Sequence, residues 1–131
     1  MKKGFRQLLE EANAEIQTLD VADAIALHGK GDVLFVDLRD PRELEKDGRI
    51  PGAFHCPRGM LEFWIDPESP YHRKAFAEPK RFLFFCAGGW RSALAAKTAQ
   101  DMGLEKVAHI EGGFTAWRKA GGPVEPVAPR A

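Results

Sequence analysis

The stretch that decides the fold of this chain is Phe82-Leu83-Phe84-Phe85-Cys86-Ala87-Gly88-Gly89-Trp90-Arg91-Ser92-Ala93-Leu94-Ala95-Ala96. Its four leading apolar residues do not alternate with polar ones, which is typical of a parallel strand buried on both faces. Gly88 and Gly89 end that strand, because glycine adopts backbone angles closed to other residues. From Arg91 the period becomes helical, with Leu94, Ala95, Thr98, Ala99 and Met102 on one face and Lys97, Gln100 and Asp101 on the other. The stretch therefore predicts a strand, a glycine loop and a helix.

Cys86 stands where the predicted strand gives way to the loop. The unpaired amides and the dipole at a helix start favour an anion, so this position favours a thiolate, and Arg91 adds a positive charge. The competing interpretation is a small core hydrophobe, which is what most single cysteines in strands are. The glycines, Arg91 and Ser92 together indicate an anion-binding turn. On the turn alone, catalysis and a structural role both remain open.

The composition indicates one ordinary globular domain of 131 residues. Its 19 basic and 19 acidic residues cancel, which argues against a nucleic-acid or anionic-membrane surface. The apolar runs are too short to span a bilayer, and residues 1–5 lack the apolar segment of a signal peptide. Two cysteines and four scattered histidines show no metal-ligand spacing. We expect a reduced, cytoplasmic protein without a metal or cofactor.

The first part of the chain, through the helix that begins at Asp40, predicts three helices and two strands. Residues 5–16 have helical apolar spacing and are expected to cover the core rather than to bind a membrane surface. A short strand over 16–19 is followed by a helix that Asp20 caps and that runs through Leu27. Residues 33–36 form a second strand buried on both faces. Asp40, Pro41 and Glu43 have the spacing of the N-cap, N1 and N3 residues of a third helix.

Asp37 and Arg39 come directly after the second predicted strand. The carboxyl ends of the strands are the edge at which open α/β sheets place their sites. A salt bridge that braces the loop is nevertheless favoured over direct chemistry. Farther along, Cys56 follows His55 in a predicted strand over 53–56, where adjacent side chains point to opposite faces. Cys56 is therefore interpreted as a small buried residue and not as half of a Cys–His pair.

The remaining segments complete an alternating α/β pattern. Residues 57–65 and 71–76 predict short helical pieces, and residues 107–110 a fifth strand in which His109 is a satisfied strand residue rather than a general base. Residues 114–120 predict a last helix, and residues 124–131 a mobile tail. Strands that alternate with helices imply a parallel sheet with helices on both faces.

Four motifs, which follow one another along the chain in the family's order, resemble those of single-domain rhodanese-like sulfurtransferases, over about residues 15–125. They are Cys86-Ala87-Gly88-Gly89-Trp90-Arg91-Ser92; Asp37-Leu38-Arg39-Asp40; Gly48-Arg49-Ile50-Pro51-Gly52-Ala53, with Arg49 where histidine is usual; and Gly112-Gly113-Phe114-Thr115-Ala116-Trp117, followed by Gly122-Pro123. The resemblance implies a three-layer α/β/α domain with a five-stranded parallel sheet in the order 1-5-4-2-3. Residues 1–131 would then be one rhodanese-like domain with an N-terminal helix over 4–14, a core over 15–125 and a mobile tail over 124–131.

The resemblance also implies a thiosulfate sulfurtransferase-type enzyme. Cys86 would take a sulfane sulfur from a small thiosulfate-like donor, form a persulfide and pass the sulfur to cyanide, to a thiol or to an acceptor protein. The substrate-binding residues would be Ala87, Gly88, Gly89, Trp90, Arg91 and Ser92, with Asp37 and Arg39 in support. A thiolate needs no general base, which agrees with the expected lack of a histidine near the loop.

Two other functions stay open. One is a cysteine phosphatase or arsenate reductase on the same fold, and the other is a non-catalytic rhodanese-like binding module. Related phosphatases have five residues between cysteine and arginine and a histidine before the cysteine. Here there are four residues in between, and Phe85 precedes Cys86. The intact Cys86 and Arg91 count against the binding module.

Overall fold

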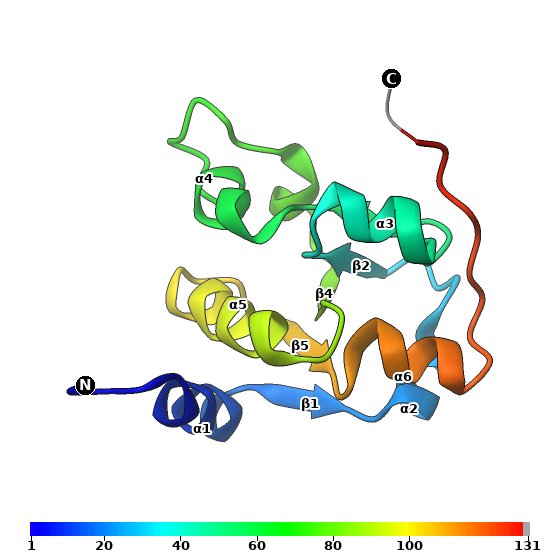
Figure 1. Ribbon diagram of the computed structural model, residues 1–131. Coiled ribbons are helices and arrows are strands. Elements are labelled where there is room, and N and C mark those ends of the chain that lie inside the picture. The colour runs from blue at the N-terminus through cyan, green and yellow to red at the C-terminus, as the bar shows by residue number, and fades with distance from the viewer. Residues whose placement is uncertain (130–131) are drawn as a thin grey trace.

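The centre of the molecule is a five-stranded parallel sheet (Figure 1). The computed structural model describes residues 1–129. The strands are β1 (Gln17–Leu19), β2 (Val33–Asp37), β3 (Phe54–His55), β4 (Arg81–Phe85) and β5 (Val107–Ile110). They lie in the order β1-β5-β4-β2-β3, which confirms the order that the resemblance implied.

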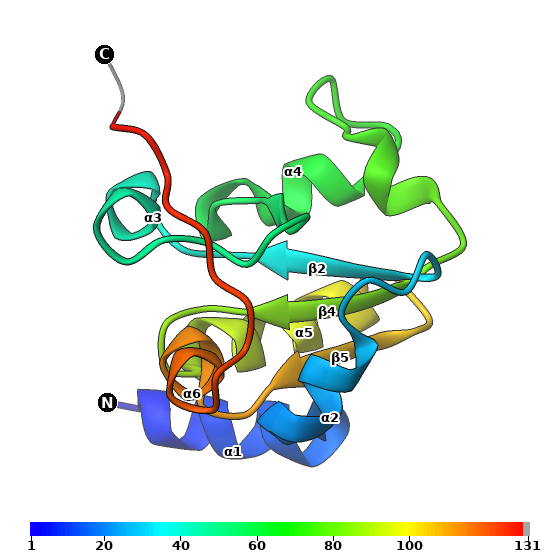
Figure 2. The same ribbon diagram turned by 90° about the vertical axis from the view of Figure 1, so that its right-hand side faces the viewer.

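Helices cover both faces of this sheet, as Figures 1 and 2 show. They are α1 (Phe5–Glu15), α2 (Val21–Leu27), α3 (Pro41–Asp47), α4 (Leu61–Ile65), α5 (Trp90–Asp101) and α6 (Gly113–Lys119), with short 3-10 helices η1 (Arg58–Met60) and η2 (Lys74–Ala77). The buried residues of α1, α4 and α5 share one core cluster, and those of α2 and α6 share the other. The three-layer α/β/α architecture is confirmed. Over residues 1–129, none of the helices combines the length and the apolar character that a membrane crossing needs.

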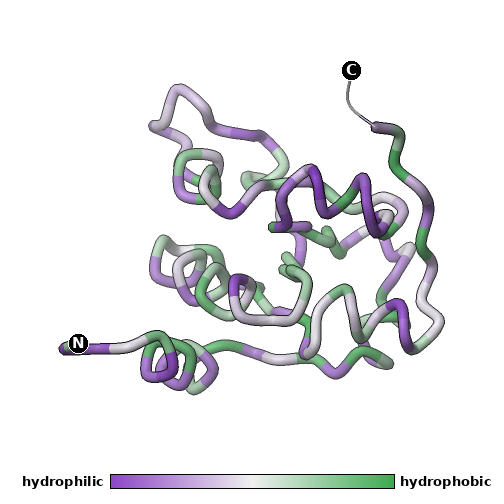
Figure 3. The backbone as a smooth tube through the Cα atoms, viewed as in Figure 1, coloured by the Kyte–Doolittle hydropathy of each residue, from purple (hydrophilic) through white to green (hydrophobic). Residues whose placement is uncertain are grey.

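β4 is buried on both faces, which explains why its sequence does not alternate. Phe82 and Phe84 belong to the cluster beneath α5, whereas Leu83 and Phe85 belong to the opposite cluster. Successive side chains of a strand point to opposite faces, so each face of a fully covered strand needs apolar residues. Figure 3 shows the contrast with α3, which is hydrophilic over most of its length.

The two predicted helix caps are present. Asp20 accepts a hydrogen bond from the Asp23 amide at 2.9 Å. At α3, the Asp40 side chain accepts from the Arg42 amide, and Glu43 Oε2 accepts from the Asp40 amide at 2.8 Å, which forms a capping box. Since α3 starts directly after β2, these caps fix its first turn at the carboxyl edge of the sheet.

The prediction for the buried faces of α1 and α5 is wrong in part. α5 buries Ser92, Ala93, Ala95, Ala96 and Ala99, whereas Met102 is exposed. The reason is that α5 packs against the sheet and also against α1, so small residues line two sides of it. α1 buries Ala12, and Ile16 after its end is also buried, but Phe5 and Leu8 are about half exposed. Only the C-terminal part of α1 therefore covers the core as predicted.

The connections differ from the predicted ranges by a few residues. The helical piece over 57–65 consists of η1 and α4, and the one expected over 71–76 is η2 at 74–77. Beyond α6, Trp117 Nε1 donates to Pro123 O at 2.8 Å, and Arg49 and Glu125 exchange backbone hydrogen bonds of 2.8 and 2.9 Å. The mobile tail predicted over 124–131 thus begins with residues tied to the domain. Its last two residues, 130–131, lie outside the described residues.

Candidate active site

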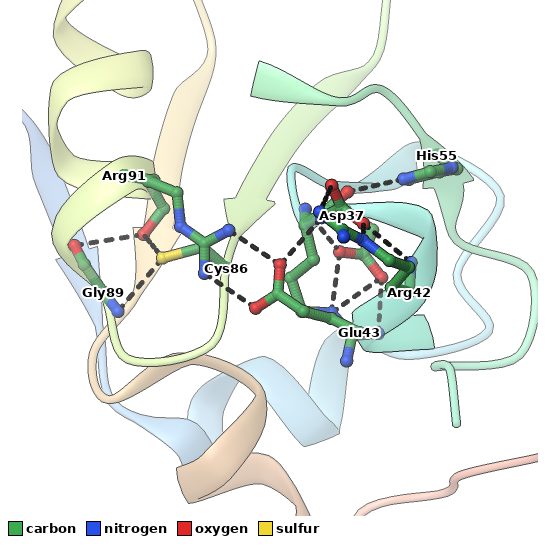
Figure 4. Close-up of polar contacts among 10 residues, drawn as sticks. Asp37, Arg42, Glu43, His55, Cys86, Gly89 and Arg91 are labelled. Carbon is green, nitrogen blue, oxygen red and sulfur yellow. Dashed lines mark hydrogen bonds and ion pairs between the residues drawn. The ribbon is translucent and has the colours of Figure 1, made fainter. Parts of the chain in front are cut away.

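Cys86 follows β4 at the carboxyl edge of the sheet, in a tight loop before α5 (Figure 4). Gly89 has a left-handed φ of 111°, and its amide donates a hydrogen bond to Cys86 Sγ at 3.1 Å. Cys86 is buried and, with Gly88, Trp90 and Arg91, lines a pocket of about 270 Å³. An amide pointed at the sulfur stabilises a thiolate more than a thiol. Of the amides predicted to cradle the sulfur, that of Gly89 is the one bonded to it.

α6 holds the cysteine loop from the other side. The amides of Phe114 and Thr115 donate to the carbonyl oxygens of Cys86 and Ala87 at 2.8 and 3.1 Å. Gly113 allows this contact, because its φ is 58° and a Cβ there would overlap the Cys86 oxygen. The C=O and N–H of a trans peptide point in opposite directions. The N–H groups of Ala87 and Gly88 therefore face away from α6.

Arg91 lines the same pocket, but a carboxylate already holds its guanidinium. Its Nη1 and Nη2 donate to Glu43 Oε2 and Oε1 at 2.9 and 3.0 Å, and Figure 4 shows the pair beside the sulfur. These hydrogen bonds raise the pKa of Arg91 and lower the pKa of Glu43. The predicted positive charge is therefore beside Cys86 but is largely balanced. Sequence reasoning recognised Glu43 only as a helix-capping residue and missed this pairing.

Asp37 and Arg39 form a buried ion pair away from the sulfur. Arg39 Nη2 lies 2.8 Å from Asp37 Oδ2 and also donates to Gly48 O at 2.9 Å. The Arg39 guanidinium sits 4.0 Å above the ring centre of Phe114, the second residue of α6. The pair therefore joins β2, the end of α3 and the start of α6. This is the brace that the sequence favoured.

Cys56 and His55 do not form a catalytic pair. Cys56 is fully buried in the α5-side cluster, and burial raises the pKa of its thiol to about 12. His55 Nε2 instead lies 2.6 Å from the carbonyl oxygen of Arg39. Cys56 is thus the small core residue that was predicted.

Ser92 and His109 form a buried polar pair behind the thiol. Ser92 Oγ lies 3.6 Å from Cys86 Sγ and 2.9 Å from His109 Nδ1, and His109 Nε2 lies 3.2 Å from Thr18 Oγ1. Burial lowers the pKa of His109 to about 4, so the imidazole is neutral at pH 7. His109 is a satisfied strand histidine, as expected. The expectation that no histidine lies near the loop is wrong, because β5 is next to β4 and lies beneath α5.

Trp90, at the end of the loop and the start of α5, is exposed. Its side chain is 63% exposed, and its ring centre lies 5.0 Å from that of Phe5 on α1. A larger cavity of about 500 Å³ lies on the α6 side of the loop and does not include the sulfur; its lining comprises Arg39, Asp47, Ala87, Phe114, Thr115, Arg118 and Lys119. Beside the thiol pocket, Trp90 and Phe5 thus form an apolar rim, although they lie far apart in the sequence.

Comparison with known proteins identifies close relatives. The model of the rhodanese-like domain family matches residues 20–120. The thiosulfate sulfurtransferase GlpE of Pseudoalteromonas translucida is 30% identical over 102 residues, which cover 78% of this chain and 89% of that protein. The mouse thiosulfate sulfurtransferase/rhodanese-like domain-containing protein 3 is 28% identical over 91 residues, or 66% of this chain; the match spans 58% of the mouse protein's length.

A solved structure from Rhodopseudomonas palustris is also very similar. That protein is of unknown function and is described as a possible tyrosine phosphatase. It is 67% identical, covers 95% of this chain and 96% of its own, and superposes with a TM-score of 0.94.

Proposed function

Since the chain belongs to the family of rhodanese-like domains, we propose that it is a sulfurtransferase that carries sulfur as a persulfide on Cys86. The proposed donor is a small thiosulfate-like molecule, and the proposed acceptor is cyanide or a thiol, including a protein thiol. The sulfurtransferase relative that is 30% identical supports sulfur transfer at the level of the family. Residues 1–131 would act as one domain, and two free cysteines suit the reducing cytoplasm, which we propose as its compartment.

The proposed reaction has two sulfur-transfer steps. The Cys86 thiolate attacks the outer sulfur of thiosulfate, so that an S–S bond forms to Cys86 and the S–S bond of the donor breaks, with sulfite leaving. Cyanide or a thiolate then attacks the terminal persulfide sulfur, and the Cys86 thiolate leaves. Neither step requires a proton from a general acid. What the protein must supply is stabilisation of negative charge on sulfur.

The observation that carries the proposal is the hydrogen bond from the Gly89 amide to Cys86 Sγ, which lines the pocket. An amide donor and the start of a helix are the kind of surroundings that stabilise negative charge on a sulfur during transfer. The pocket has room for a sulfur atom beyond Sγ, and the N–H groups of Ala87 and Gly88 face away from α6. Arg91 at the pocket wall contributes positive charge, tempered by Glu43.

Sulfur loading tests the proposal directly. We expect protein treated with thiosulfate to gain the mass of one sulfur atom, which cyanide removes as thiocyanate. C86S should gain none, and C56S, a change in the core rather than at the pocket, should load like the parent. Loading that is abolished in a folded C56S but retained in C86S would contradict the assignment.

Phosphate-ester hydrolysis is the second candidate, because the Rhodopseudomonas palustris relative is described as a possible tyrosine phosphatase. Two features disfavour it. The loop has one residue fewer between Cys86 and Arg91 than the phosphatase loops it resembles, which leaves a smaller ring of amides around an anion. The position before the cysteine, where the related phosphatases have a histidine, is Phe85 in this chain.

The same preparation distinguishes the candidates. We expect thiocyanate formation from thiosulfate and cyanide, and no measurable hydrolysis of an aryl phosphate. Phosphate release that requires Cys86, without sulfur loading, would replace the sulfurtransferase with a phosphatase. Binding of a protein partner that C86S leaves unchanged, with neither activity, would indicate a binding module.

A further inference from the structure

A line of hydrogen-bonding groups leads from the Cys86 sulfur to the sheet edge. Ser92 on α5, His109 on β5 and Thr18 on β1 are joined by contacts of 3.6, 2.9 and 3.2 Å, counted from the sulfur. Ser92 and His109 are buried, whereas Thr18 is exposed on the edge strand and paired in register with His109. The sulfur is thus connected to the surface by a route that does not pass through the pocket.

The number of protons on these side chains allows the hydrogen bonds of this line to run in either of two directions. A serine hydroxyl has one proton, and a neutral imidazole has one N–H and one bare nitrogen. If Cys86 is a thiolate and Ser92 donates to it, Ser92 Oγ can accept from His109 only when the imidazole proton is on Nδ1. Nε2 is then bare and can accept from Thr18. If Cys86 is a thiol that donates to Ser92, the serine proton can point to Nδ1, and the imidazole proton is on Nε2.

The two arrangements differ by one proton. In going from thiol to thiolate, the sulfur proton moves to Ser92, the serine proton moves to His109 Nδ1, and the Nε2 proton leaves through Thr18 to water. The bonds formed and broken are O–H and N–H bonds, and the imidazole stays neutral on both sides. A neutral His109 at pH 7 agrees with this account, since burial holds its pKa near 4.

We propose that His109 is a positioning residue for the thiolate: its Nδ1–H donates to Ser92 Oγ, which leaves the serine proton free to point to the Cys86 sulfur and so favours the thiolate there. The role of His109 in sulfur transfer rests on the proposed function, whereas its effect on the Cys86 thiolate does not. The competing position of the Ser92 proton is toward Gly89 O, at 3.2 Å. An Nδ1–H donor on His109 leaves that choice open to the serine, but the negative sulfur is the stronger acceptor.

The charged groups beside the thiol do not belong to this line of hydrogen-bonding groups. The charged side chains facing Cys86 are Arg91 on α5 and Glu43 on α3, which pair with each other. α6 contributes amides to the carbonyls of the loop, and next to His109 the β4 neighbour in register is Phe84. A substitution at His109 therefore tests the line of hydrogen bonds with the ion pair held constant.

The test is the pH profile of Cys86 alkylation by iodoacetamide, a reaction of the thiolate that requires no sulfur donor. H109L should slow alkylation at pH 7 by about tenfold, the equivalent of one hydrogen bond to a charged group. H109N places an amide N–H near the position of Nδ1–H and should stay within about threefold of the parent. S92A should match H109L, and the double variant should be no slower than either.

A spectroscopic measurement covers the case in which H109L does not fold. Imidazole ¹⁵N shifts of the parent protein should show the Nδ1–H tautomer of His109 where Cys86 is a thiolate and the Nε2–H tautomer where acid has protonated it. An Nε2–H tautomer in both states, or an H109L profile equal to that of the parent, overturns the proposal. Failure of the sulfurtransferase assignment appears separately, as parent protein that alkylates normally but does not load sulfur.

Discussion

The two cysteines lie in opposite chemical settings although neither is exposed. Cys86 accepts the Gly89 amide at a pocket, whereas Cys56 sits in the core with a pKa raised to about 12 by burial. We expect iodoacetamide at pH 8 to add once to the native chain and twice to the chain unfolded in guanidinium, as measured by intact mass. C86S should gain no adduct while folded. Two additions to the native protein would show that the Cys56 site opens readily.

The Glu43–Arg91 pair predicts a pH-dependent contribution to stability. The pKa of Glu43 is lowered from 4.5, chiefly by its hydrogen bonds with Arg91. A carboxylate with a lower pKa in the folded state stabilises the protein above its unfolded pKa, and this contribution is lost as the pH falls through the folded value. E43Q should therefore lose about 0.5–1 kcal/mol at pH 7, a modest value because solvent weakens a partly exposed pair.

The measurement is the difference in urea unfolding between E43Q and the parent from pH 7 downward. The difference should shrink as the pH falls below 4.5. Glutamine at this position can still accept from the Asp40 amide, so the capping box is kept. E105Q, at an exposed position, is the matched control and should show no such trend. A constant difference across the pH range would assign the effect of E43Q to packing.

At the scale of elements, the contact between α6 and the cysteine loop depends on Gly113. G113A should lose sulfur loading or folding, because its Cβ would overlap carbonyl atoms of Cys86 and Ala87. G121A is the matched control: Gly121 also has a positive φ, of 82°, but no atom lies within 4 Å of its added Cβ. The control should lose only about 1–2 kcal/mol from backbone strain. Equal losses in urea unfolding for the two variants would contradict a specific clash.

Local sequence signals predicted the helices and strands. The contacts that these signals did not predict depend on long-range packing. The apolar run of β4 and the caps at Asp20 and Asp40 are encoded within a few residues, so they could be predicted directly. The order of the strands came from the resemblance to a family and not from periodicity. The pairs Arg91–Glu43 and Ser92–His109 join residues 48 and 17 positions apart, and no short-range pattern marks such contacts.

At the scale of the whole molecule, residues 123–125 hold the last helix against the rest of the domain. Truncation after Gly122 should lower the free energy of unfolding by about 1–3 kcal/mol, because the buried indole of Trp117 loses its acceptor on Pro123. It also removes the Arg49–Glu125 bridge. Truncation after Val127 keeps both contacts and should leave urea unfolding unchanged. Similar stability of the two truncated chains would show that residues 123–125 contribute little to the free energy of unfolding.

The sheet order has a consequence for how the protein is made. β1 pairs with β5, whose residue His109 is synthesised 91 positions after its neighbour Thr18. A ribosome therefore releases the N-terminal helix and strand long before their partner exists, and it releases the cysteine before α6. Until β5 and α6 emerge, the nascent thiol lacks both the hydrogen bonds to the carbonyls of its loop and the imidazole behind its serine. The surroundings that the fold gives Cys86 therefore assemble only after both of these elements have been synthesised.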